Sequence, residues 1–174
     1  KMSELFGSLV SPSVSRDKRI TVLNTPLNGV SGYFSSADSY PRWVHPSSNE
    51  REIIFMDPQR VPVGTQQYLA VLAHEYQHAI HNYYDSGEES WVNEGLSELA
   101  VELLGFENRF KEYHLKNPSI QLNFWSSNPS EAVKDYAASS SFFSFLINEN
   151  GATTTLSDLV GEQEDGVRGL NKWL

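Results

Sequence analysis

The chain has 174 residues, 39% of them hydrophobic and 12% aromatic, which predicts a single globular domain over residues 1–174. Its 13 basic and 22 acidic side chains leave a formal net charge of −9, which disfavours binding to nucleic acids and to anionic membranes, because both require clustered Lys and Arg. The absence of Cys excludes disulfides, thiolate nucleophiles and Cys-ligated metal sites. No apolar run reaches the length of a membrane span, and the first residues do not resemble a signal peptide.

The first third of the chain is predicted to form strands and loops. Residues 1–18 are polar and poorly patterned and are predicted to form an arm or a first turn, and strand-forming residues occupy Arg19–Thr25. Asn28-Gly29 is a turn signal, so Val30–Phe34 is predicted to return as the second strand of a hairpin. Glu52–Asp57 is a compact apolar run followed by a proline, which predicts one more strand.

From Thr65 onward the apolar residues recur with the period of a helix. Helices are predicted over Thr65–Tyr84, Asn93–Leu104, Glu107–Lys116, Ser130–Asn150 and, more weakly, Leu156–Leu174. Thr65 and Ser130 are expected to cap their helices, and Gly105 is expected to end the second. Strands followed by helices favour an α+β fold, with a small twisted N-terminal sheet in residues 1–64 and a mostly helical part in residues 65–174.

The acidic excess is concentrated in one part of the chain. Val61–Asn108 contains eight acidic residues and no Lys or Arg, so the rest of the chain is nearly balanced in charge. Such a stretch is a disordered tail, a solvated face or a cation site. The apolar residues and three histidines within it argue against a disordered tail.

The residues His74-Glu75-Tyr76-Gln77-His78 match the H-E-x-x-H metal motif and lie within the long predicted helix. At positions i and i+4 the two imidazoles project from one helix face and can share a Zn²⁺ ion, while Glu75 can reach a metal-bound water. The competing interpretation is that both histidines are ordinary polar residues of an amphipathic helix.

A catalytic zinc site needs a third protein ligand. His81 lies roughly 10 Å further along the helix axis, so it is expected to be a polar surface or outer-shell residue. His114 is isolated on a charged segment, and the sequence lacks the Gly and third His of the metzincin motif. Glu94 is therefore the preferred ligand, because the loop over Asp85–Val92 lets the next helix fold back beside the first.

Four of the remaining acids of the stretch are interpreted in two groups, and Glu102 and Glu107 are assigned no role. Glu98 lies one turn after Glu94 and is predicted to accept the second N–H of a metal-ligating histidine. The loop acids Asp85, Glu88 and Glu89 are predicted to be solvated.

An H-E-x-x-H motif followed by Asn-Glu-Gly in the next helix resembles the gluzincin zinc metallopeptidases. The segments HEYQHAIH, WVNEGLSELAVELLG and GYFSSADSYP…SNEREIIFMD resemble the hyicolysin family most closely, over about residues 19–151. Two features depart from the family pattern. The gap of 15 residues between His78 and Glu94 is slightly short for larger gluzincins, and the chain lacks the large helical domain that many relatives carry after the site.

The resemblance implies roles for particular residues. His74, His78 and Glu94 would bind zinc, Glu75 would be the catalytic base, and Glu98 would lie in the outer shell. The fold would be zincin-like, with an edge strand bordering the cleft, for which Glu52–Asp57 is the candidate. The donor to the oxyanion would be Tyr136 or, as second choices, Tyr83 or Tyr84. The resemblance further implies a secreted or cell-surface protein.

The sequence therefore predicts a zinc-dependent peptide-bond hydrolase, favouring an endopeptidase, in which Glu75 activates a zinc-bound water to attack a polypeptide substrate. One alternative is a catalytically inactive zinc-binding or adhesion domain of the same fold. A second is a helical interaction module whose acidic face docks a basic partner.

Overall fold

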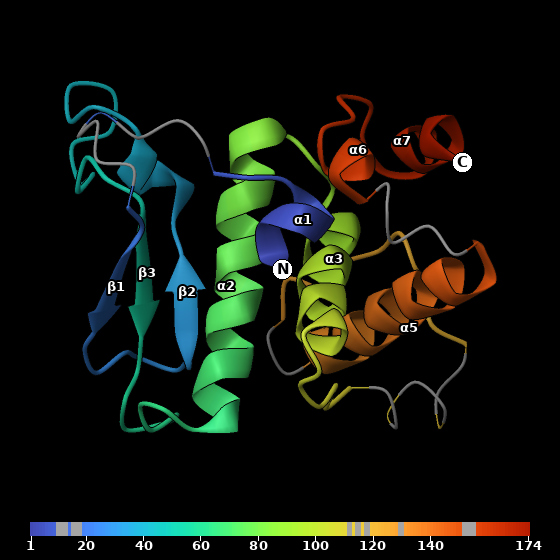
Figure 1. Cartoon of the computed structure of the whole chain (residues 1–174), viewed down its shortest axis with the longest axis horizontal. Helices are drawn as coiled ribbons and strands as arrows, with labels where there is room; N and C mark the ends of the chain where they lie inside the picture. The colour runs from blue at the N-terminus through green and yellow to red at the C-terminus, as the bar shows by residue number, and fades with distance from the viewer. Residues whose placement is uncertain are drawn as a thin grey trace.

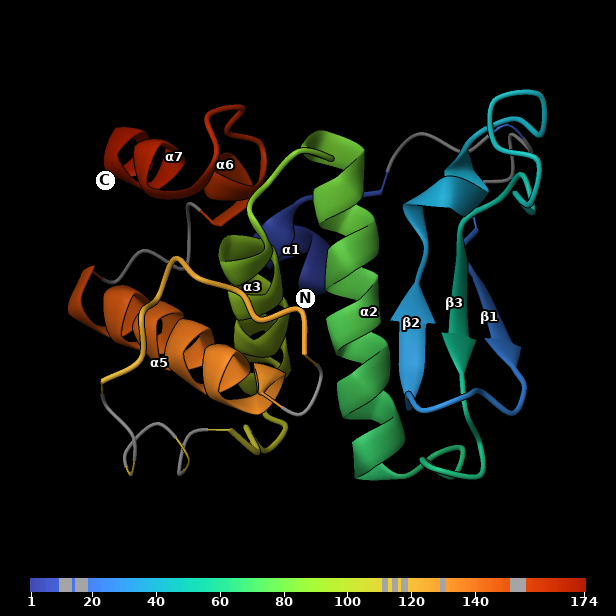
Figure 2. The same ribbon diagram turned by 180° about the vertical axis from the view of Figure 1, so that it is seen from behind.

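A small sheet comes first along the chain and a larger helical part follows it (Figure 1). The computed structural model describes residues 1–9, 14, 19–110, 113, 116, 119–128, 131–150 and 156–174. The helix α2 (Gln66–Tyr84) stands between the sheet and the other helices in both views (Figures 1 and 2). The α+β prediction is confirmed.

Within the described residues three strands form one sheet, in the order β1–β3–β2. They are β1 (Thr21–Asn24), β2 (Gly32–Phe34) and β3 (Ile53–Met56), with β3 parallel to β1 and antiparallel to β2. The predicted hairpin is wrong, although Gly29 has the positive φ of a turn. All four residues of β3 are buried, so β3 takes the central place and separates the other two strands. The prediction that Glu52–Asp57 supplies the edge strand is wrong for the same reason.

The edge strand β2 lies directly against α2 (Figure 2). Gly32 allows this approach, because a Cβ there would lie 2.8 Å from Cγ1 of Val71 and 3.0 Å from Sδ of Met56. The space between sheet and helix is filled by Ile54, Met56, Val61 and Tyr68. The helix begins as predicted, with Oγ1 of Thr65 accepting a hydrogen bond from the backbone N–H of Tyr68 at 3.1 Å.

The helix α3 (Ser90–Leu103) packs between α2 and α5 (Ala132–Asn150). It begins three residues earlier than predicted, and Gly105 follows its end with a positive φ, as expected for that position. Gly95 lets α3 lie close to α5, since a Cβ there would lie 2.5 Å from Cδ2 of Phe143. The buried side chains of this interface include Trp91, Leu96, Leu99, Phe143 and Ile147.

Short helices occupy both ends of the chain. The helix α1 (Met2–Phe6) packs against α2 and α6 (Leu156–Val160), and its Met2 and Phe6 side chains are buried. Of the two predicted alternatives, residues 2–6 therefore form a first turn and not a polar arm. The helix α7 (Gly166–Trp173) follows α6, and a 3₁₀ turn, η1 (Ser36–Ser39), follows β2. None of the described helices is long and apolar enough to cross a membrane.

One predicted helix cannot be compared in full. Glu107–Phe110 form loop and turn rather than helix, and most of the remaining residues up to Lys116 lie outside the described part of the chain. The predicted cap Ser130 also lies outside the described residues, whereas α5 ends at Asn150 as predicted.

Candidate metal centre

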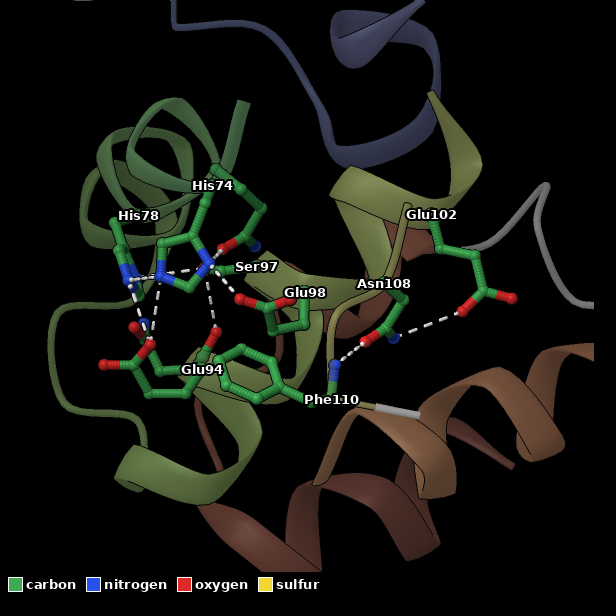
Figure 3. Close-up of polar contacts among 10 residues, drawn as sticks. His74, His78, Glu94, Ser97, Glu98, Glu102, Asn108 and Phe110 are labelled. Carbon is green, nitrogen blue, oxygen red and sulfur yellow. Dashed lines mark hydrogen bonds and ion pairs between the residues drawn. The ribbon is translucent and has the colours of Figure 1, made fainter. Parts of the chain in front are cut away.

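The helices α2 and α3 lie side by side and bring together His74, His78 and Glu94, which we call the first cluster (Figure 3). Nε2 of His74 lies 3.0 Å from Nε2 of His78. Oε2 of Glu94 lies 3.1 Å from the first of these nitrogens and 3.3 Å from the second. The three residues predicted as ligands therefore meet, and they form a group that could hold a metal ion.

The spacing of these atoms fits a tetrahedral cation. Ligand atoms bound at about 2.0–2.1 Å in tetrahedral geometry lie about 3.3–3.4 Å apart. Oε2 of Glu94 is buried and has no hydrogen bond of good geometry, although both imidazole nitrogens are close to it. A cation between the three atoms would take up all three lone pairs.

Buried side chains orient both imidazoles from behind. Oγ of Ser97 donates to Oε1 of Gln77 at 2.5 Å, so its contact of 3.1 Å with Nδ1 of His78 requires that nitrogen to donate. Nδ1 of His74 lies 3.0 Å from Oε1 of Glu98, a buried carboxylate, although the angle is not that of a good hydrogen bond. Both contacts favour a proton on Nδ1 and leave Nε2 to face the centre of the cluster.

The electrostatics of the first cluster favour positive charge. Burial alone lowers the pKa of His74, but contacts with Glu94 and Glu98 and the nearby charge of Glu75 raise it to about 10. Burial opposes ionisation of Glu94, yet the two imidazoles hold its pKa well below the usual range. A divalent cation can replace the proton that these carboxylates hold on the imidazole.

Glu75 is buried beside the first cluster and is joined to the sheet. Its Oε2 accepts a hydrogen bond from the backbone N–H of Phe34 in β2, at 2.9 Å. The edge strand thereby fixes the carboxylate next to His74. A pocket of about 260 Å³ lies at this place, lined by Phe34, Ser36, His78, Asn82, Asn93 and Glu94.

Of the three candidate tyrosines, Tyr136 is the one that reaches the first cluster. Its ring lies 6.2 Å from the ring of His74, and its hydroxyl is close enough to Glu94 for the two groups to interact electrostatically. Burial, together with the charge of Glu94, raises the pKa of Tyr136, so the phenol keeps its proton. The hydroxyl of Tyr84 instead donates to a backbone carbonyl of the N-terminal segment, and Tyr83 is exposed.

The predictions for the end of α2 are wrong. His81 has an exposed fraction of 0% and no hydrogen-bond partner at either ring nitrogen, so it is neither a surface residue nor a contact of the first cluster. Asp85 is buried and Glu88 is half-buried, whereas Glu89 is exposed as expected. The other candidate ligand, His114, lies outside the described residues.

Three contacts of the site were not predicted: those made by Gln77, by Ser97 and by the backbone N–H of Phe34. A weak signal existed for Ser97, which lies three residues after Glu94 and therefore near the same helix face. No protein-family model matches the chain, and no curated protein matches it significantly. The functional interpretation therefore depends on the motifs and on the geometry of the first cluster.

Proposed function

We propose that the chain is a zinc-dependent hydrolase of peptide bonds, with zinc held by His74, His78 and Glu94. The observation that carries the proposal is the approach of two Nε2 atoms and one Oε2 atom to within 3.3 Å of one another. Two imidazoles and one carboxylate are a donor set of catalytic zinc, which keeps a fourth position for water or substrate.

Bound zinc supplies a Lewis acid that polarises the scissile carbonyl and makes water more acidic. Glu75 takes a proton from the attacking water and later gives it to the leaving amine. Because its Oε2 accepts the Phe34 N–H, the proton is transferred at the other oxygen, Oε1. The same hydrogen bond keeps the carboxylate oriented between the two transfers.

Tyr136 is the donor that we assign to the developing oxyanion. Its hydroxyl already lies near Glu94 of the first cluster, and its raised pKa keeps the proton available. The polar side chains of Ser36, Asn82 and Asn93 line the adjacent pocket and offer hydrogen-bonding groups to a peptide backbone.

Metal analysis and cleavage of denatured casein test the proposal together. Wild-type protein should contain zinc and cleave casein, and Glu75→Gln should retain zinc while losing about 10²–10⁴-fold in rate, because the general base is removed. Glu107→Gln is the matched control, since Glu107 is an exposed acidic residue of the same acidic segment, Val61–Asn108.

Three outcomes contradict the proposal at different points. A zinc content below about a tenth of an equivalent would contradict the proposal that the chain binds zinc. Equal activity of wild type and Glu75→Gln would remove the assigned base. A zinc-loaded wild type that cleaves no peptide would favour the alternative of an inactive zinc-binding domain.

A further inference from the structure

A second group of metal-ligand side chains lies at the C-terminal end of α2 and in the connection to α3. His81, Asp85 and Glu88, which we call the second cluster, each place one ligand atom within 4.8 Å of those of the other two. The proposed hydrolase mechanism uses none of these residues.

His81 gives the strongest sign that the second cluster binds something. The side chain is completely buried, and neither Nδ1 nor Nε2 has a hydrogen-bond partner. A neutral imidazole carries one donor and one acceptor, and buried polar atoms of proteins are normally paired because unpaired ones destabilise the fold. The acceptor nitrogen therefore has a lone pair for a ligand that the protein itself does not supply.

Asp85 adds an unpaired oxygen to the same place. Its Oδ1 accepts the backbone N–H of Gly87 at 2.9 Å, while its Oδ2 is buried without a partner. The backbone N–H of Asp85 donates to the carbonyl of His81 at 2.7 Å, so the two residues lie one helical turn apart. A buried carboxylate oxygen beside an unpaired imidazole is costly unless a cation joins them.

Glu88 links this place to the C-terminal segment. Its Oε1 accepts the backbone N–H of Gly166, the first residue of α7, at 2.8 Å. The basic side chains of α7 point to other partners: Arg168 lies near Glu164, and Lys172 pairs with Glu162.

We propose that His81, Asp85 and Glu88 bind a divalent first-row transition-metal cation, and that this ion ties the end of α2 to the start of α7. One imidazole with two carboxylates suits Zn²⁺ or Mn²⁺, whereas Ca²⁺ and Mg²⁺ prefer oxygen ligands alone. Ligand atoms around such ions lie about 3–4 Å apart, so binding draws the group together slightly. Glu88, the least buried of the three, makes this movement.

Counting bound zinc in full-length variants tests the second cluster separately from the first. Wild type should carry two equivalents after gel filtration, and His74→Ala/His78→Ala should carry one. Glu88→Gln should also carry one and still cleave casein, while the combination of all three substitutions should carry none. Glu107→Gln is the control and should carry two.

A second readout uses the His74→Ala/His78→Ala variant, in which the first cluster is disabled. Zinc at about 100 times its dissociation constant should raise the melting temperature by roughly 5–10 °C. Adding Glu88→Gln, or Asp85→Asn if the first change only weakens binding, should abolish this shift. Excess Ca²⁺ should not displace the zinc.

The proposal is overturned if the His74→Ala/His78→Ala variant folds but binds no zinc and shows no thermal shift. It is equally overturned if Glu88→Gln and Asp85→Asn together leave the zinc count unchanged, or if Ca²⁺ displaces the second equivalent, because His81 would then not be a ligand. If wild type cleaves no casein while His74→Ala/His78→Ala still carries one zinc, the proposed hydrolase function is contradicted and the second metal site is not.

Discussion

The two clusters occupy the same helix, but their imidazoles are held in different ways. In the first cluster Nδ1 of His78 is hydrogen-bonded to Ser97, and Nδ1 of His74 lies 3.0 Å from the carboxylate of Glu98 without good hydrogen-bond geometry. In the second cluster neither nitrogen of His81 has a hydrogen-bond partner. Outer contacts fix the orientation of a ligand before the metal binds, whereas a site without them takes its final shape from the ion. Under the two proposals, the first cluster is a preformed site for chemistry and the second is a site at which an ion joins two elements.

The largest difference between the two clusters is expected when the pH is lowered and His81 becomes protonated. Burial, together with repulsion from His78, lowers its pKa to about 4, below the value of 6.5 for the unfolded chain. Between these pH values the unfolded chain binds a proton and the folded chain does not. With metal removed by EDTA, the free energy of unfolding should therefore decrease by about 3 kcal/mol as the pH is lowered from 6.5 to 4. Above pH 6.5 this group should make no pH-dependent contribution. Chemical denaturation at several pH values measures this.

The variant His81→Gln isolates this contribution, because glutamine does not titrate. His74 acts with the opposite sign: its folded pKa of about 10 exceeds 6.5, so its stabilising effect is complete below 6.5 and is lost as the pH rises through 10. Wild type and His81→Gln share this alkaline loss. Parallel stability curves for the two proteins on the acid side would contradict the assignment.

The next largest effect is expected from Glu98→Gln, which weakens the outer contact of His74. Zinc affinity of the first cluster should fall about 10–100-fold, because the carboxylate no longer fixes the tautomer and the ring. Competition with a chromophoric chelator measures this. The second cluster should keep its affinity, and a fall at both clusters would show that the variant acts through the fold instead.

A smaller effect is expected from Ser97→Ala. This change removes the acceptor for Nδ1 of His78 and leaves the buried amide of Gln77 without its hydroxyl partner, so unfolding should become easier by about 1 kcal/mol. Zinc affinity should decrease by less than in Glu98→Gln, since no charge is lost. Ser140→Ala is the control, because that buried serine makes one long hydrogen bond within α5, at 3.4 Å.

The parts of the fold that local signals specify could be predicted. Thr65 caps α2 through its own side chain, and the motif residues His74 and His78 share a face by helix geometry alone. The place of β3 could not be predicted, because its parallel pairing with β1 joins segments about thirty residues apart. No turn residue determines that pairing; it results from burying all of β3.

In the two clusters, too, some features could be predicted from the sequence and others could not. The approach of Glu94 to His74 and His78 could be predicted, because a short loop returns α3 to α2. The burial of His81 could not be predicted, because it depends on tertiary packing by segments distant in sequence, such as α1, and the periodicity of α2 carries no information on that packing. The hydrogen bond between Phe34 and Glu75 could not be predicted from the sequence either, because its donor is a backbone N–H that almost any residue at this position would supply.

That main-chain donor has a practical consequence for mutational scanning. Replacing the Phe34 side chain leaves its N–H in place, so the hydrogen bond to Glu75 stays intact whatever the side chain does in the pocket. Proline alone among the natural residues lacks the donor. The hydrogen bond that orients the proposed base would thus be missed by an alanine scan and revealed by a proline scan.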